Sequence, residues 1–500
     1  MDVVTIGDQP LTVADVRKVA RGAGIDLHAG AIDRIRAGRE VVNSALAADK
    51  PIYGLNTGVG HLKDVRLPHE ELRRAQEMLV RTHAGGLGPP ETTEVVRAAL
   101  VVRLNGISRG GSGASFPVAE VLAAMLNAGV HPIVPRYGSV GAADLPQMAA
   151  IALVAIGEGR AEYRDETLPG GEALRRAGIV PVVLEPKDGL ALVSANGISV
   201  GNGALVVMRA ADLAEAADVA AALSLEAARG NPSTILPVVG RAKPYPGQIS
   251  TLHSMQTALQ GSYLFEPGAP ASIQDPLSFR VVPQVHGALR EFITFARRAV
   301  EMELNSMSDN PLVSVEDRTM VSNGNFHPIV PAIAFDSLRI AIAHVGQLSE
   351  RRMSHLWDAF FETAGDAADW RPGGTSEFFG LWLRYAAASQ IAELKQLAAP
   401  ATLDVPPLDM EVEDHATSAP LTVRKTASAL ELLESLLTIE MLLARDVVSL
   451  SRTWLKLGTG TEAALRAIDD VLAASADDRS PAAMHELVRK VVAPELYDRA

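Results

Sequence analysis

Four segments in the second part of the chain are rich in Ala, Leu, Glu and Arg and carry apolar residues at helical spacing. They cover residues 203–229, 284–307, 331–358 and 424–455. Helices of about thirty residues exceed the usual length in globular proteins, and they bury their apolar sides by packing against one another. The pattern predicts a mainly α fold with a long helical bundle over residues 201–500, which is also the expected oligomerisation region.

Residues 1–200 show a different pattern, in which glycine clusters interrupt short helical stretches. Because glycine lets backbones approach closely, several glycine-rich loops suit segments that converge on a site. We therefore expect residues 1–200 to form a loop-rich catalytic region. Two interruptions are predicted in the second part: a long loop or broken helix at 231–283, where prolines are dense, and a break at 365–375.

Composition excludes several classes of protein. Hydrophobic residues make up 48% of the 500 residues, which excludes a disordered chain. No uninterrupted apolar run approaches the ~20 residues of a membrane span, and the N-terminus does not resemble a signal peptide. Without cysteine there are no disulfides or thiolate metal sites, and the histidines form no metal-binding string. A net charge of −13 disfavours nucleic acid. We expect a cytoplasmic protein that binds no metal, membrane or nucleic acid.

Seven short strings carry most of the specific information: 53–60 (YGLNTGVG), 104–113 (LNGISRGGSG), 274–280 (QDPLSFR), 308–312 (SDNPL), 324–327 (GNFH), 348–352 (LSERR) and 413–415 (EDH). In this order they resemble the aromatic amino acid ammonia-lyase family, which includes the histidine and phenylalanine ammonia-lyases. The resemblance implies a helical bundle of the ammonia-lyase/fumarase type. It also implies a homotetramer whose active sites are built from several chains and take a small amino acid or betaine.

One loop departs from the family. Residues 138–148 read GSVGAADLPQM, whereas the resemblance implies an Ala-Ser-Gly triad that cyclises into the electrophile methylidene-imidazolone (MIO). Cyclisation needs a glycine amide and a serine hydroxyl, and here Ala142 and Ala143 lead straight into Asp144. Leu277 also stands where histidine ammonia-lyases carry a tyrosine that serves MIO. We therefore expect no MIO and no other cofactor.

The resemblance assigns catalytic and anchoring roles to two residues. Tyr53 matches the base that removes the proton next to the aromatic ring. The ordinary pKa of a tyrosine, ~10, is too high for a base near neutral pH, and neighbouring positive charge or helix N-termini could lower it. Arg280 matches the arginine that holds the substrate carboxylate with both guanidinium arms. From the residues alone, Tyr53 could instead be a packing residue and Arg280 a structural ion-pair partner.

Other matches describe the rest of the pocket. A histidine at position 83 and a glutamate at position 413 resemble the histidine-type enzymes and suit an imidazole-type ring, since a carboxylate accepts a ring N–H. Asn196, in competition with Ser194, matches a residue that helps hold the carboxylate. Three further residues are expected in the pocket, and each could instead have only a structural role: Gln274, Phe326 and Arg384. Phe326 could face an alkylammonium group. His61 and Lys63 are polar where histidine ammonia-lyases are mostly apolar or small.

The leading hypothesis is a MIO-independent carbon–nitrogen lyase that resembles ergothionase and eliminates trimethylamine from an imidazole-type betaine such as ergothioneine. Three alternatives stay open. The chain could be a MIO-type histidine or tyrosine ammonia-lyase or aminomutase, although two residues rather than one separate Gly141 from Asp144. It could be another MIO-free lyase of a biosynthetic pathway. It could also be a catalytically inactive paralogue that binds a ligand.

Overall fold

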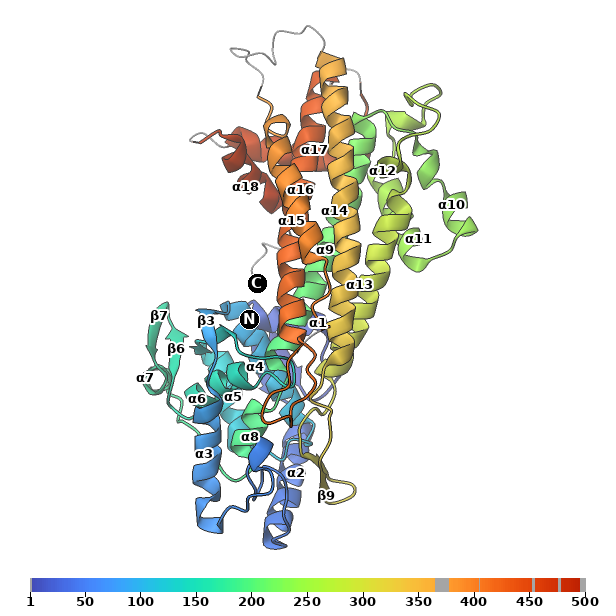
Figure 1. The fold of residues 1–500 in the computed structure, drawn as a ribbon. Helices are drawn as coiled ribbons and strands as arrows, with labels where there is room; N and C mark the ends of the chain where they lie inside the picture. Colours follow the sequence, from blue (N-terminus) through green and yellow to red (C-terminus); the bar gives the residue numbers. More distant parts are fainter. Residues whose placement is uncertain (1, 365–376, 404, 452–454, 475–477, 495–500) are drawn as a thin grey trace.

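The protein is an elongated, mainly helical molecule with a long bundle at one end and a loop-rich region at the other (Figure 1). The computed structural model describes residues 2–364, 377–403, 405–451, 455–474 and 478–494. The predicted break at 365–375 lies outside these residues.

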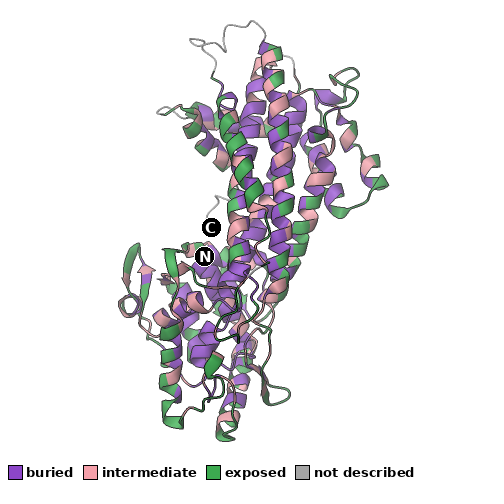
Figure 2. Ribbon diagram, viewed as in Figure 1, coloured by how far each residue is buried: buried purple, intermediate pink, exposed green. Residues whose placement is uncertain are grey.

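The bundle is formed by four long helices: α9 (Gly197–Ala227), α13 (Val282–Leu304), α14 (Ile329–Ala364) and α16 (Ala419–Ser451). They confirm the four helical segments predicted from residue spacing, with ends displaced by a few residues. α14 packs against α16 and α13, and α16 packs against α9 (Figure 1). Buried residues run along nearly the whole of α9, so this helix lies at the centre of the bundle (Figure 2).

Two stretches are long and apolar enough to cross a membrane by length and composition, although charged residues interrupt the apolar run in each. They are Asp188–Ala227 and Ile329–Ala364. Their most apolar windows are 94% and 61% buried inside the protein. Helices that are apolar on most sides are typical of a large helical core as well as of a membrane, and here their apolar sides face other helices.

Shorter helices complete the bundle. The proline-rich segment forms a broken helix, as one of the two sequence alternatives predicted: η3 (Pro232–Ile235), α10 (Pro237–Ala242), α11 (Pro246–Ala258), η4 (Tyr263–Phe265) and α12 (Leu277–Arg280). The C-terminal part adds η6 (Leu381–Leu383), α15 (Arg384–Leu397), α17 (Thr459–Ala474) and α18 (Pro481–Val492).

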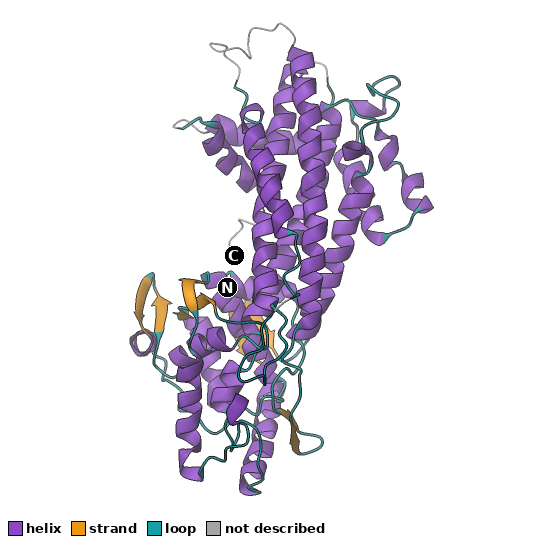
Figure 3. Cartoon of the chain, in the orientation of Figure 1, coloured by secondary structure: helices purple, strands orange, loops and turns teal. Residues whose placement is uncertain are grey.

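The loop-rich region contains short helices and small sheets (Figure 3). Its helices are α1 (Val13–Ala20), α2 (Ala29–Ala47), η1 (Gly60–Leu62), η2 (His69–Glu71), α3 (Leu72–His83), α4 (Thr93–Ser108), α5 (Phe116–Ala128), α6 (Leu145–Ala155), α7 (Gly170–Arg176) and α8 (Asp188–Val193). Its strands are β1 (Val3–Ile6), β2 (Gly24–Leu27), β3 (Leu87–Pro90), β4 (His131–Pro132), β5 (Pro135–Tyr137), β6 (Arg160–Tyr163), β7 (Glu166–Pro169), β8 (Leu312–Ser314) and β9 (Thr319–Val321). β1 and β2 pair in parallel, and the other pairs are antiparallel. One cluster of buried apolar residues extends from Val4 to Ala493 and joins both ends of the molecule.

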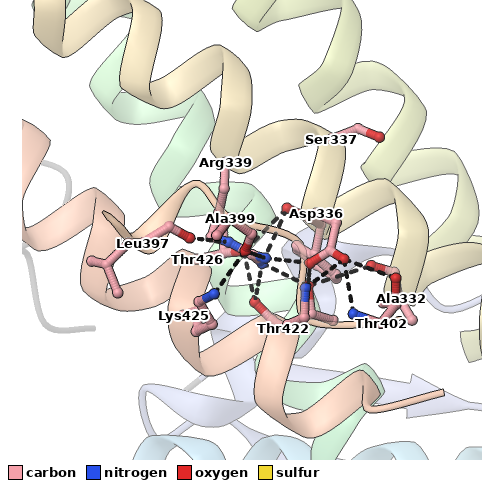
Figure 4. A network of polar contacts seen from close by, with 12 residues as sticks. Ala332, Asp336, Ser337, Arg339, Leu397, Ala399, Thr402, Thr422, Lys425 and Thr426 are labelled. Atoms are coloured by element: carbon pink, nitrogen blue, oxygen red, sulfur yellow. Dashed lines mark hydrogen bonds and ion pairs between the residues drawn. The ribbon is translucent and has the colours of Figure 1, made fainter. Parts of the chain in front are cut away.

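A buried arginine on α14 ties a loop to the bundle (Figure 4). Arg339 forms an ion pair with Asp336 and donates to the carbonyls of Leu397, at 2.9 Å, and Ala399, at 3.2 Å. It also donates to Oγ1 of Thr422 on α16, at 2.6 Å. The network holds residues 397–402 against α14 and α16, and these residues precede the segment that carries Glu413.

Candidate active site

The loop that departs from the family is buried and anchored to the start of α9. Ala142 and Ala143 are 7% and 4% exposed, and Asp144 is fully buried. The Asp144 carboxylate accepts from the backbone N–H of Ser199 at 2.7 Å and from its hydroxyl at 2.8 Å. Burial raises the pKa of Asp144, and the Ser199 hydrogen bonds oppose that rise. Asp144 thus fixes the end of the loop.

The two alanines form a tight turn. Ala143 has a φ of 60°, in the left-handed region that β-carbons disfavour, and it bridges back to Gly141. Its backbone N–H donates to the carbonyl of Phe326 at 3.2 Å, so the 324–327 string lies against this loop. The Ser139 hydroxyl donates to the Ala143 carbonyl at 3.0 Å. Positions 142 and 143 therefore present methyl groups only, and the nearby hydroxyl is already engaged.

Three predicted site residues, Tyr53, Glu413 and His83, lie close enough for their charges to interact. The Tyr53 hydroxyl accepts from the backbone N–H of Gly60 at 3.1 Å. Burial raises the pKa of Tyr53, the Gly60 N–H lowers it, and the negative charges of Glu413 and Asp409 raise it further. Burial and then Asp409 also raise the pKa of Glu413, while His83 lowers it. Among the described residues, the charges that act on the pKa of Tyr53 are therefore negative.

The histidine of this group has a defined orientation. His83 Nδ1 lies 2.8 Å from the carbonyl of Leu79. Because a carbonyl only accepts, Nδ1 carries the proton, and Nε2 is left for a ligand or for Glu413. His83 is the last residue of α3, so the helix backbone positions the ring.

Asp409 is a member of this group that the sequence did not reveal. Its carboxylate lies 2.6 Å from His61 Nδ1 and accepts from the His61 backbone N–H at 3.0 Å. A β-carbon at Gly60 would meet Asp409 Oδ2 at 2.0 Å, so the close approach requires glycine there. Nothing in the sequence marks Asp409 except its place four residues before Glu413. Lys63, by contrast, is exposed and pairs with Asp64.

Asn196 precedes the first residue of α9 and is 4% exposed. Its carboxamide oxygen and nitrogen are buried without a hydrogen-bond partner among the described residues. It lines a cavity of about 20 Å³ together with Glu303 and Ser308. Burial raises the pKa of Glu303 to about 7. Unpaired buried amide groups are costly, so Asn196 is poised to bind a ligand or a water.

The remaining predicted residues lie at a distance in this chain. Arg280 ends α12, beside the far part of the bundle (Figure 1), and Gln274 is exposed on the loop before it. The 23 residues of α13 separate Arg280 from the 305–327 loops, a length of about 35 Å. Arg384, on α15, donates to Glu350 at 2.5 Å and to the Ser354 hydroxyl at 2.6 Å. The predicted site residues of one chain therefore lie in two separate groups, which we call half-sites below.

Two further features complete the description. His327 Nε2 lies 2.7 Å from His415 Nδ1, beside the turn and two residues after Glu413. Within the described residues, no three His, Asp or Glu side chains form a group that could hold a metal ion.

Comparison with known proteins identifies the family. The family model described as aromatic amino acid lyase matches residues 11–470. The chain belongs to the aromatic amino acid lyase family. Its relatives in this family include the histidine ammonia-lyase of Gloeobacter violaceus, 38% identical over 461 residues that cover 92% of this chain and 89% of the relative. The histidine ammonia-lyase of Treponema denticola is 37% identical over 478 residues, covering 95% and 94%.

Three solved structures have the same fold. Ergothionase from Treponema denticola, in complex with desmethyl-ergothioneine sulfonic acid, matches with a TM-score of 0.91 at 28% identity, covering 99% of both chains. Histidine ammonia-lyase from Trypanosoma cruzi matches with a TM-score of 0.89 at 30% identity, covering 99% and 94%. Tyrosine aminomutase from Streptomyces globisporus matches with a TM-score of 0.89 at 29% identity, covering 99% and 97%. The predicted family and mainly α fold are confirmed.

Proposed function

We propose that this aromatic amino acid lyase works without MIO and eliminates trimethylamine from an imidazole-type α-amino acid betaine such as ergothioneine. The observation that carries the proposal is the turn at 141–144. Ala142 and Ala143 offer neither the serine hydroxyl nor the glycine amide from which MIO forms, and Asp144 follows at once. The residues present do not fit the prosthetic group.

A lyase without an electrophile needs a nitrogen that leaves readily. In a betaine the nitrogen already carries a permanent positive charge. When a base takes the hydrogen of the β-carbon as a proton, the carbon–carbon double bond forms. The bond between Cα and nitrogen breaks, and its electron pair departs on neutral trimethylamine. An ordinary α-amino acid would have to expel ammonia, which leaves poorly from a carbanion-like intermediate unless the amino nitrogen is first activated.

The charges around Tyr53 suit a cationic substrate. Glu413 and Asp409 raise the pKa of Tyr53 in the free site. The same negative charges attract a trimethylammonium group, which in turn lowers the pKa of Tyr53 by placing a positive charge nearby. Substrate binding would thus supply the charge that makes Tyr53 a base. In this scheme Glu413 and His83 hold the imidazole-type ring, and Phe326 faces the methylated nitrogen by cation–π attraction.

The second half-site must come from another copy of the chain. Arg280, with Gln274 beside it, would hold the carboxylate there, and Arg384 would lie near the ring substituent. Large apolar side chains are exposed along one stretch of α13 and α14, and such faces are typical of subunit interfaces: Phe292, Phe295, Met302, Val330, Ile333 and Ile340. These observations support a homotetramer with shared active sites. In this proposal the enzyme is cytoplasmic and its partner is a small-molecule substrate.

The alternative function is MIO-type deamination or an aminomutase reaction. It is favoured by the 35–38% identity to proteins named histidine ammonia-lyase. An inactive binding paralogue or another MIO-free lyase remains a further alternative.

Purified protein separates these functions. We expect ergothioneine or hercynine to release trimethylamine, histidine and tyrosine to release little ammonia, and the intact mass to equal the encoded mass without loss of two waters. Borohydride should leave the activity unchanged. Thiourocanate and urocanate absorb at different wavelengths, so absorbance identifies the product. Inactivation by borohydride with a mass adduct at residues 138–148 would establish the MIO-type alternative. Absence of any product from the whole set would favour the inactive paralogue.

A further inference from the structure

The turn that carries Arg280 has little support of its own. α12 has four residues, Leu277–Arg280, and no side chain caps its first turn. A helix this short is not stable by its own hydrogen bonds. Val281, with φ −100° and ψ 12°, interrupts the helical conformation between α12 and the start of α13. Arg280 itself is half-buried, and its Nε has no hydrogen-bond partner among the described residues. Its direction must therefore be set by neighbours.

A buried arginine of the 348–352 string provides that support. Arg352, on α14, is fully buried and donates through Nη1 to the backbone carbonyl of Ser278, at 3.1 Å. Its other two nitrogens bind the carboxylate of Glu440 on α16, with Nε at 2.6 Å and Nη2 at 2.9 Å. Glu440 is fully buried and also accepts from the Ser224 hydroxyl of α9, at 2.6 Å. All three guanidinium nitrogens are thus engaged, and only one of them touches α12.

The same turn of α14 serves Arg384. Glu350 lies two residues before Arg352 and accepts from Arg384 Nη2. Phe279, the neighbour of Arg280, packs against the ring of His355 of α14, with centroids 5.9 Å apart. Residues 350–355 of α14 therefore contact both segments that carry the basic residues of the second half-site.

We propose that the Arg352–Glu440 pair is a positioning device for Arg280. It connects α9, α16 and α14 to the Ser278 carbonyl and so fixes the angle at which Arg280 meets the substrate carboxylate. The inference rests on the proposed function in one respect, namely that Arg280 binds a carboxylate. The other possible role of the pair is only to join the bundle helices, and ligand binding distinguishes the two roles.

The test compares two ligands by calorimetry on the assembled enzyme. Urocanate carries an imidazole and a carboxylate, and 4-methylimidazole carries the ring alone. The double variant Arg352→Met/Glu440→Leu replaces the pair by apolar side chains of similar size, an exchange that buried ion pairs often tolerate. We expect it to weaken urocanate binding about 10-fold, because misalignment of Arg280 removes about one charge-assisted hydrogen bond to the carboxylate. The affinity for 4-methylimidazole should change less than twofold. KM for a turned-over substrate should rise more than kcat falls.

Two further variants make the test specific. Adding Arg280→Ala to the double variant should weaken urocanate no more than Arg280→Ala does alone, because coupled residues are not additive. Arg97→Met is the matched control for lost stability. Arg97 is a buried arginine of α4 that donates to the carbonyls of Val19, Ala23 and Leu126, away from α12. It should leave the affinities for both ligands unchanged. Amide hydrogen exchange at 277–281 should become faster only in the Arg352 variants.

Each other outcome has a distinct meaning. Equal weakening of both ligands, or additive effects with Arg280→Ala, overturns the positioning role. If Arg280→Ala weakens urocanate and the double variant does not, only the positioning role is wrong. If Arg280→Ala itself has no effect, the carboxylate role of Arg280 and its positioning both fail. If urocanate binds normally but no betaine releases trimethylamine, only the proposed substrate is wrong.

Discussion

Glu303 offers a test of the electrostatics behind the candidate site. The Glu303 side chain lines the cavity next to Asn196, and burial raises its pKa from 4.5 to about 7. A carboxyl whose folded-state pKa is raised binds its proton more tightly in the folded protein. It therefore stabilises the fold below pH 4.5, relative to high pH, and this stabilisation is lost as the pH rises through 7. Each pH unit between these values corresponds to about 1.4 kcal/mol, so the full effect is about 3 kcal/mol.

The substitution Glu303→Gln removes the titration and keeps the shape of the side chain. In urea unfolding we expect the two proteins to have similar free energies of unfolding at pH 4.5. At pH 8 the variant should be more stable by up to about 3 kcal/mol. The comparison at low pH is the internal control for packing changes. A difference that is independent of pH would refute the reasoning, because the carboxyl would then not be titrating in this window.

Four further predictions concern single residues. Tyr53→Phe keeps the ring and removes the base, so kcat should fall 10²–10⁴-fold with an unchanged circular dichroism spectrum; near-normal turnover would place the base elsewhere, with His83 the first alternative. Arg280→Ala should raise KM for the betaine by at least about tenfold, because a charge-assisted partner of the carboxylate is lost; an unchanged KM would contradict this. Glu413→Gln should impair imidazole-type substrates more than phenyl-type ligands, measured as the ratio of their kcat/KM or Kd values, and equal impairment would argue against a ring contact. Arg339→Met removes the ion-pair partner of buried Asp336, which keeps its hydrogen bonds from Thr422 and residues 401–402, and should lower the free energy of unfolding by about 3 kcal/mol. A loss under 1 kcal/mol in urea unfolding would show that the network of Figure 4 contributes little.

The helices illustrate which features can be predicted locally. The spacing and abundance of apolar residues placed α9, α13, α14 and α16 within a few residues of their ends. A helix with one buried side repeats its apolar side chains every three to four positions, and a helix buried on most sides, such as α9, is apolar nearly throughout. The missing serine and glycine at 142–143 can also be read directly, since cyclisation involves only adjacent residues. Composition alone does not separate a core helix from a membrane helix, and the apolar stretches in α9 and α14 are long enough for either.

Tertiary structure decided the rest. The sequence alone marked Tyr53, Glu413 and Arg280 as residues that could act on one substrate. Only the fold shows that Glu413 lies close enough to Tyr53 to raise its pKa, while Arg280 lies at the other end of a helix about 35 Å long. The fold also places Asp409 near Tyr53, and burial together with the negative charges of Glu413 and Asp409 raises the pKa of the tyrosine. Burial and charge interactions depend on every atom nearby, including atoms from distant parts of the chain, so no local pattern of residues contains them.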